Sequence, residues 1–307
     1  MAKVKEEEKD KILGIPAEEY FAPGHRACAG CGQALAVRYA LKAAGKETIV
    51  CNNTGCLEVF STPYPETSWR VPWIHVAFEN AAAVASGVEK AFKHLNKKAN
   101  ILAFAGDGGT FDIGLQSLSG AAERGHDFCY VCFDNGAYMN TGIQRSGATP
   151  KFTDTTTTPY GSKVHGKLEM KKDMPFIMAA HRAYVATASV AFPQDLVKKV
   201  QKGLEFNGPA YIQIDSPCTL GWRIKSDDTI NVSKLAFDSR LYPLFEIENG
   251  VLKNLMKPSK QTPVLECLKI QGRFKSLNEQ EVKEIQDEVD AYWNRLLKLE
   301  EIGVRLF

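Results

Sequence analysis

The sequence predicts an α/β fold with a doubly wound, mostly parallel sheet. Short apolar runs that are typical of buried strands alternate with longer amphipathic segments that are typical of helices. This alternation favours parallel strands joined by helical crossovers. Strands are expected at 48–52, 100–105, 128–133, 184–188 and 210–215. Helices are expected after residue 32 and at 81–94, 195–206 and 278–300.

The bulk composition indicates an ordinary globular protein. The chain has 307 residues and a formal charge of +2, which gives no reason to expect nucleic acid as a partner. It contains no apolar run of about 18 residues, and its charged N-terminus lacks the apolar core of a signal peptide. We therefore expect a cytoplasmic protein without a membrane partner. Three regions are predicted: an N-terminal arm at 1–20, a main domain at 21–240 and a C-terminal extension with a helix at 241–307.

Two strand ends carry the strongest signal for a ligand. The run 100–105 leads into Gly106, Asp107, Gly108 and Gly109, and the run 128–133 leads to Asn135. If both strands are parallel, their carboxyl ends meet at one edge, where open α/β sheets bind ligands. A carboxylate and an amide oxygen at this edge suit Mg²⁺, and glycines let the backbone approach phosphates closely.

Eight cysteines need an explanation in a reducing compartment, where disulfides are rare. Cys28 and Cys31 form a C-x-x-C in a glycine-rich loop, and two further cysteines, Cys56 and Cys218, each lie just beyond a predicted strand. Four thiolates from these loops could hold Zn²⁺ or an iron–sulfur cluster. The remaining four are expected to be mainly buried: Cys129 and Cys132 on opposite faces of one strand, Cys267 without a function, and Cys51 as a reserve ligand.

Together these motifs resemble the β subunits of the 2-oxoacid:ferredoxin oxidoreductases, with pyruvate:ferredoxin oxidoreductase nearest. The spacing from the GDG triplet to Asn135 resembles the diphosphate signature of thiamine diphosphate enzymes. The other matching stretches lie at 24–32, 54–58, 72–75, 78–80, 106–114, 137–144, 208–218 and 271–274. The likeness therefore covers nearly the whole chain.

The resemblance implies a diphosphate-binding half of a thiamine diphosphate fold, with thiamine diphosphate, Mg²⁺ and a 4Fe–4S cluster as cofactors. It places Mg²⁺ on Asp107, Asn135 and the carbonyl of Ala137, and the cluster on the four dispersed cysteines. The remaining residues that it assigns are the phosphate-binding Gly106, Gly108, Gly109 and Thr110 and the catalytic Asn140 and Asp112. Many relatives have glutamate where this chain has Gly136, which leaves the surroundings of the metal, and the substrate choice, open.

The resemblance also implies partners. An α subunit would carry the pyrimidine-binding domain and the activating glutamate, because Glu79 is better explained as a carboxylate at a helix start. Gamma and ferredoxin-like delta subunits or domains would pass electrons to external ferredoxin. The substrates would be a 2-oxoacid and coenzyme A.

Several features have competing interpretations. The segment 134–173 is expected to be a long ordered loop or cofactor lid, with Lys167, Lys171 and Lys172 on a solvated face or docking ferredoxin or coenzyme A. His25 and His75 could touch a cofactor or be satisfied locally, and the pair Trp69 and Trp73 is expected to pack. The favoured reaction is oxidative decarboxylation of pyruvate; oxalate, 2-oxoglutarate, 2-oxoisovalerate or an aryl glyoxylate could replace pyruvate as the substrate. Two further hypotheses are a zinc-stabilised thiamine enzyme subunit without redox function and a non-catalytic structural subunit.

Overall fold

A single eight-stranded sheet organises the chain. The computed structural model describes residues 11–12 and 14–307, so most of the predicted N-terminal arm lies outside the described residues. The sheet order is β10-β9-β7-β8-β6-β5-β3-β4. Its strands are β3 (Thr48–Asn53), β4 (Trp73–Val76), β5 (Asn100–Gly106), β6 (Cys129–Asp134), β7 (Tyr184–Ser189), β8 (Ala210–Asp215), β9 (Glu246–Glu248) and β10 (Val251–Lys253).

Six neighbouring strands, from β7 to β4, are parallel, whereas β9 and β10 pair antiparallel at one edge. The doubly wound, mostly parallel α/β fold is therefore confirmed. The expected strands at 48–52, 100–105, 128–133, 184–188 and 210–215 are all present within a residue or two.

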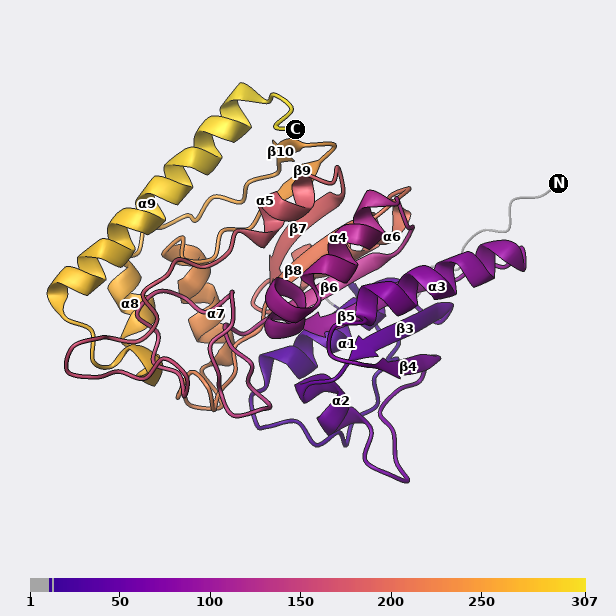
Figure 1. Cartoon of the computed structure of the whole chain (residues 1–307), viewed down its shortest axis with the longest axis horizontal. Helices are drawn as coiled ribbons and strands as arrows, with labels where there is room; N and C mark the ends of the chain where they lie inside the picture. The colour runs from indigo at the N-terminus through magenta and orange to yellow at the C-terminus, as the bar shows by residue number, and fades with distance from the viewer. Residues whose placement is uncertain (1–10, 13) are drawn as a thin grey trace.

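Helices cover both faces of the sheet. One face packs against α1 (Gly32–Ala44) and α6 (Pro193–Glu205), which also contact each other. The other face packs against α3 (Ala81–His94), α4 (Leu115–Glu123) and α5 (Met174–Ala179). Figure 1 shows α3 and α4 in front of the sheet. These two apolar interfaces fix the strands whose carboxyl ends carry the predicted site.

The C-terminal region adds both strands and helices to this framework. α7 (Thr229–Asp238) and α8 (Val264–Leu268) are short, while α9 (Glu279–Ile302) is long and begins with a capping box between Asn278 and Glu281. Trp293 and Leu296 of α9 join the core on the α3 side of the sheet. Because β9 and β10 extend the main sheet, this region is packed closely against the rest; the predicted boundary at residue 240 stays a prediction.

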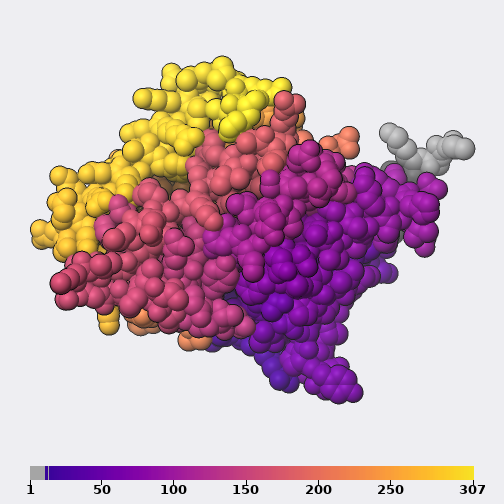
Figure 2. Space-filling model, viewed as in Figure 1, coloured from indigo at the N-terminus to yellow at the C-terminus, as the bar shows by residue number. Residues whose placement is uncertain are grey.

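The segment between β6 and α5 contains no helix or strand, as expected for an ordered loop. Figure 2 shows the C-terminal helix, in yellow, lying over this part of the molecule, and Lys151 pairs with Glu284 and Glu288 of α9. Near the N-terminal end of the described residues, the carbonyls of Pro16, Ala17 and Glu18 accept hydrogen bonds from Lys42 Nζ. The short strand β4 begins at the end of the tryptophan-rich segment.

Smaller elements complete the chain. β1 (Lys11–Ile12) and β2 (Ile15–Pro16) form a separate antiparallel pair. α2 (Cys56–Ser61) follows β3, a π-helical turn covers Gly109–Ile113, and a 3₁₀ turn covers Gly272–Phe274. No described helix is long and apolar enough to cross a membrane.

Candidate active site

Asp107 and Asn135 meet at the carboxyl edge of the sheet. β5 and β6 are parallel neighbours, and Asp107 and Asn135 directly follow their last residues, Gly106 and Asp134. Both side chains are buried. The Asn135 backbone N–H donates to Asp107 Oδ1 at 3.3 Å, which links the two strand ends. The predicted convergence at this edge is therefore present.

Three oxygen-bearing groups come close enough here to share a cation. One of the two terminal atoms of the Asn135 side-chain amide lies 2.8 Å from the Ala137 carbonyl oxygen and 2.9 Å from Asp107 Oδ1. With the amide oxygen in this place, three oxygens face one another; with the amide nitrogen there, it donates to both neighbours. An octahedral Mg²⁺ with oxygens at about 2.0 to 2.1 Å places adjacent ligands about 2.8 to 3.0 Å apart. The donor set therefore fits Mg²⁺ in both chemistry and spacing.

A layer of hydrogen bonds holds these groups in place. The Ser146 hydroxyl donates to Asp107 Oδ2, and Thr149 Oγ1 donates to the carbonyl of Gly136 at 2.7 Å. Trp222 Nε1 donates to the Asn135 carbonyl at 2.6 Å. Burial, together with the nearby charge of Asp134, raises the pKa of Asp107 above its usual range. A carboxylate in such a place is stabilised by a bound cation.

Glycines bring this site together. A Cβ on Gly108 would lie 2.4 Å from the Tyr138 ring, and one on Gly109 would lie 2.1 Å from Asn53 Nδ2, so neither position accepts a side chain. Between these segments runs a narrow groove of about 30 Å³. Its walls include Gly106, Gly108, Gly109, Asn135, Ala137, Asn140 and Cys56.

Three predicted site residues have different surroundings. Asn140 is exposed and lines the groove. Thr110 is fully buried, and its hydroxyl donates to the Gly106 carbonyl at 2.8 Å, so it supports the turn rather than lining the groove. Asp112 accepts a hydrogen bond from the Gly147 N–H at 2.8 Å and pairs with Lys172 at 2.6 Å. Its carboxylate therefore attaches the 134–173 loop; the catalytic role assigned to it stays a prediction.

The C-x-x-C loop packs against the segment that carries Cys218. Gly32 N–H donates to the Pro217 carbonyl at 3.0 Å, and Thr219 Oγ1 donates to the Ala29 carbonyl at 3.0 Å. A Cβ on Gly30 would lie 2.1 Å from the Ser226 carbonyl oxygen, so this close approach requires glycine. On the other side, the Arg26 N–H donates to the Phe60 carbonyl of α2, the helix that begins at Cys56.

The four predicted cluster cysteines influence one another electrostatically. Burial, with the charges of Cys218 and Cys28, raises the pKa of Cys31 to about 11. Burial also raises the pKa of Cys56 to about 12, with the other three thiols and Asp107 contributing. Cys31 caps the N-terminus of α1, where backbone N–H groups stabilise a thiolate. The thiols thus gather beside the Asp107 site, although no three His, Cys, Asp or Glu side chains within the described residues are placed to hold a single metal ion.

The other cysteines are buried in the core. Cys129 and Cys132 belong to apolar clusters on opposite faces of β6, as the strand periodicity predicts. Cys51 is completely buried among the side chains of the α3 face, and Cys267 is completely buried beside Val232.

Trp69 and Trp73 stack with their ring centroids 5.7 Å apart, and His75 Nε2 is 2.8 Å from Thr54 Oγ1. His25 stacks against Phe21.

The three lysines of the 134–173 loop differ in exposure: Lys167 is buried, Lys171 is half-buried and Lys172 is exposed. Lys167 is 1 % exposed and donates to the carbonyls of Thr149 and Met170. Lys171 pairs with Asp134 and Lys172 with Asp112. The expected solvated face is therefore wrong at Lys167, because residue spacing in an irregular loop does not show which side chains the fold buries; a role of these lysines in docking ferredoxin or coenzyme A stays a prediction.

Some supporting residues had no local signal. Ser146, Thr149 and Trp222 reach the site from loops with no pattern of their own. Arg273, which donates weakly to the Asn135 carbonyl at 3.5 Å, lies in the matching stretch 271–274, whose position in the site is visible only in the fold.

Comparison with known proteins agrees with this geometry. Residues 53–214 match the C-terminal, thiamine diphosphate-binding domain of thiamine pyrophosphate enzymes. The chain is 55 % identical over 288 residues to pyruvate synthase subunit PorB of Methanocaldococcus jannaschii, covering 91 % of this chain and 97 % of that protein. It is 44 % identical over 301 residues to ketoisovalerate oxidoreductase subunit VorB of Pyrococcus furiosus, covering 95 % and 97 %.

A solved structure gives the same result. The 2-oxoglutarate:ferredoxin oxidoreductase of Magnetococcus marinus aligns with a TM-score of 0.57 and 26 % identity, over 66 % of this chain and 69 % of that one. The geometry at the carboxyl edge of the sheet, the matched domain and the near full-length relatives all indicate the same family. The chain belongs to the β subunits of the 2-oxoacid:ferredoxin oxidoreductases, within the thiamine diphosphate enzymes.

Proposed function

We propose that this chain is the β subunit of a pyruvate:ferredoxin oxidoreductase, which oxidatively decarboxylates pyruvate to acetyl-coenzyme A and CO₂. The observation that carries the proposal is the spacing of 2.8 and 2.9 Å between the Asn135 amide, the Ala137 carbonyl and Asp107. Pyruvate is favoured because the relative at 55 % identity is a pyruvate synthase subunit. Bound thiamine diphosphate supplies the carbanion that attacks the 2-oxo carbon.

The residues of this chain then have separate tasks. Asp107, Asn135 and the Ala137 carbonyl would hold Mg²⁺, and the backbone at Gly106, Gly108 and Gly109 would leave room for the diphosphate. Asn140 is exposed at the groove, where it would face the substrate. Ser146 and Trp222 keep the metal-binding groups oriented through Asp107 and the Asn135 carbonyl.

The four gathered thiols complete the proposal. Cys28, Cys31, Cys56 and Cys218 would hold a 4Fe–4S cluster, which would supply single-electron redox chemistry. Two observations support a cluster next to the cofactor: Cys56 lines the diphosphate groove, and Asp107 contributes to its raised pKa. Electrons would pass onward through clusters of ferredoxin-like delta or gamma partners to external ferredoxin. An α subunit would supply the activating glutamate and most of the substrate pocket.

One alternative within the family has a specific observation behind it. The 44 % identical relative is a ketoisovalerate oxidoreductase subunit, so 2-oxoisovalerate is the second candidate substrate. The two candidates differ in the size of the group on the 2-oxo carbon. The substrate pocket, which the partner subunit would largely form, would distinguish them by that size.

The test is a substrate panel on the complex purified from its native source. Reduction of viologen would be measured with pyruvate, 2-oxoisovalerate, 2-oxoglutarate, an aryl glyoxylate and oxalate, each with and without coenzyme A. We expect pyruvate to have the highest kcat/KM and to require coenzyme A. A colourless protein would support zinc instead of a cluster, and a higher kcat/KM for any other substrate would overturn the assignment to pyruvate.

A further inference from the structure

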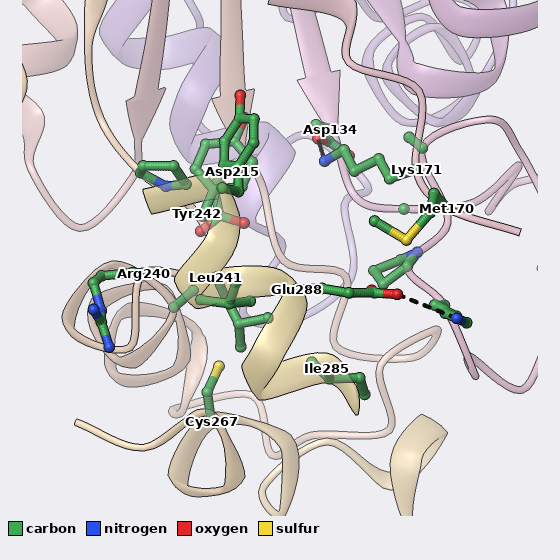
Figure 3. Close-up of a pocket in the computed structure, with 18 of the residues that line it drawn as sticks. Asp134, Met170, Lys171, Asp215, Arg240, Leu241, Tyr242, Cys267, Ile285 and Glu288 are labelled. Carbon is green, nitrogen blue, oxygen red and sulfur yellow. Dashed lines mark hydrogen bonds and ion pairs between the residues drawn. The ribbon is translucent and has the colours of Figure 1, made fainter. Parts of the chain in front are cut away.

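A second and much larger cavity is lined in part by Asp134 and Gly136, the two neighbours of Asn135. Its volume is about 410 Å³, within the range of small-molecule sites. It is enclosed by the ends of β6 and β8, the 134–173 loop, α8 and α9. Figure 3 shows Asp215 and Tyr242 on one side, Asp134 and Lys171 on another, Leu241 in the middle and Ile285 below them.

The cavity contains one buried cation without a carboxylate partner. Most lining cations are paired, as Lys171 is with Asp134 and Arg240 with Asp290. Arg273 is 5 % exposed, and no ion pair links it to any carboxylate of the described residues. It contacts the Gln271 amide oxygen at 2.9 Å and stacks over the Trp222 ring at 3.9 Å. An unpaired buried guanidinium is costly, and an anionic ligand group would offset that cost.

The same cavity contains a buried carboxylate without a cation partner. Asp215 is 2 % exposed, and within the described residues it has no ion pair; Ser189 Oγ lies 3.4 Å away. Burial raises the pKa of Asp215 to about 6, although the charge of Arg273 opposes this increase. Arg273 and Asp215 thus act on each other electrostatically from beyond ion-pair distance, and both line the cavity.

We propose that this cavity binds a small apolar α-amino acid as a zwitterion. Its carboxylate would pair with Arg273, its ammonium group with Asp215, and its side chain would pack among Leu241, Leu268, Phe274 and Ile285. A simple carboxylic acid would leave Asp215 unpaired, and a simple amine would leave Arg273 unpaired. Only a molecule with both charges and an apolar part uses all three features of the site.

The cavity is connected to Asn135, one of the proposed metal ligands, through two side chains. Arg273 Nη1 donates to the carbonyl of Asn135 at 3.5 Å, and the Trp222 ring against which Arg273 stacks donates to the same carbonyl. An amino acid on Arg273 therefore contacts the group that orients Asn135. Binding itself does not depend on the proposed enzymatic function.

Calorimetric titration of the purified complex tests the chemistry. The ligands are L-leucine, L-methionine and L-phenylalanine, with two matched controls, 4-methylpentanoate and 3-methylbutylamine, which each keep the leucine side chain but lack one charge. We expect at least one amino acid to bind at least tenfold more tightly than both single-charge controls. Equal affinity for the acid or the amine, or no binding by any of the three amino acids, would overturn the proposal.

Three variants test the location. Asp215→Asn should weaken amino-acid binding by tenfold or more because it removes the charge at nearly constant shape. Leu241→Trp should abolish binding by filling the cavity, whereas the matched control Leu95→Trp, at an exposed position just beyond α3, should leave it unchanged. Unchanged affinity in both cavity variants would place the bound amino acid elsewhere and overturn the assignment.

Discussion

At the residue scale, the most consequential side chain is Asp107. Asp107→Asn keeps the shape of the side chain and its place beside Ser146. It removes the negative charge that would bind Mg²⁺. We expect thiamine diphosphate affinity to fall by about tenfold or more, which corresponds to at least about 1.4 kcal/mol. Cofactor content after gel filtration is the measurement, and the visible absorbance of the cluster should be unchanged. Asp238→Asn, at a carboxylate paired with Lys234, is the control; full cofactor retention in Asp107→Asn would contradict the metal assignment.

The cysteines provide a second test at this scale. Alanine at any one of Cys28, Cys31, Cys56 or Cys218 should bleach or destabilise the cluster, because each change removes one of four thiolates. Cys129→Ala should leave the colour intact and cost only packing free energy, about 1 kcal/mol, because Cys129 is buried among apolar side chains. Iron and sulfide content per chain measures the difference. A bleached Cys51→Ala protein alongside a coloured Cys56→Ala protein would show that the ligand set is wrong at that position.

Asp215 gives a prediction about pH. Its folded-state pKa of about 6 lies above its ordinary value of 3.8, so the folded protein binds the proton more tightly. The free energy of unfolding should therefore fall as pH rises from about 4 to about 6. Asp215→Asn lacks this titration, so its stability relative to the parent should increase over that window by up to about 3 kcal/mol. Urea unfolding of the chain without cofactors at pH 4 and pH 6.5 tests this; a pH-independent difference would contradict it.

At the element scale, the 134–173 loop depends on specific attachments. Lys172 bridges this loop to the Asp112 carboxylate and the Phe111 carbonyl. We expect Lys172→Met to loosen residues 145–150, including Ser146, and to weaken thiamine diphosphate binding by about three- to tenfold, or about 1 kcal/mol. Hydrogen exchange of this loop is the direct measurement. Lys163→Met, in the same loop but exposed, is the matched control, and equal exchange in both variants would rule out the attachment.

The elements also show what sequence reasoning can reach. Long periodic segments are predicted closely: α3 has the expected bounds, and the buried strands β5, β6 and β8 agree within a residue or so. β4, β9 and β10 escape prediction because strands of three or four residues owe their existence to pairing with neighbours rather than to their own pattern. In the site, the strand-end motif predicts the positions of Asp107 and Asn135, whereas Ser146 and Trp222 arrive from distant loops through tertiary packing.

At the scale of the whole molecule, the described residues have the diphosphate half of a thiamine site but no second large sheet for the pyrimidine half. We expect the isolated chain, supplied with iron, sulfide, Mg²⁺ and thiamine diphosphate, to show less than about 1 % of the viologen reduction of the complete complex, because under the proposed function a partner supplies the glutamate that activates the cofactor. Adding the α subunit should restore turnover of the 2-oxoacid. Substantial turnover by the chain alone would mean that it contains both halves.

The wide sequence separation of the groups around Asn135 has a consequence for biosynthesis. A ribosome releases the chain from its N-terminus, so Asp107 and Asn135 emerge long before Trp222 and Arg273, which hold the Asn135 carbonyl. Strands β3 to β8 likewise lie between Cys28 and Cys218 in the sequence. The groups that support Asn135 are therefore complete only after residue 273, and the four thiols only after residue 218, of the 307 residues. Under the proposed ligand set, insertion of the cluster therefore follows the synthesis of residue 218, and a nascent chain that stalls earlier would carry only three of the four thiols.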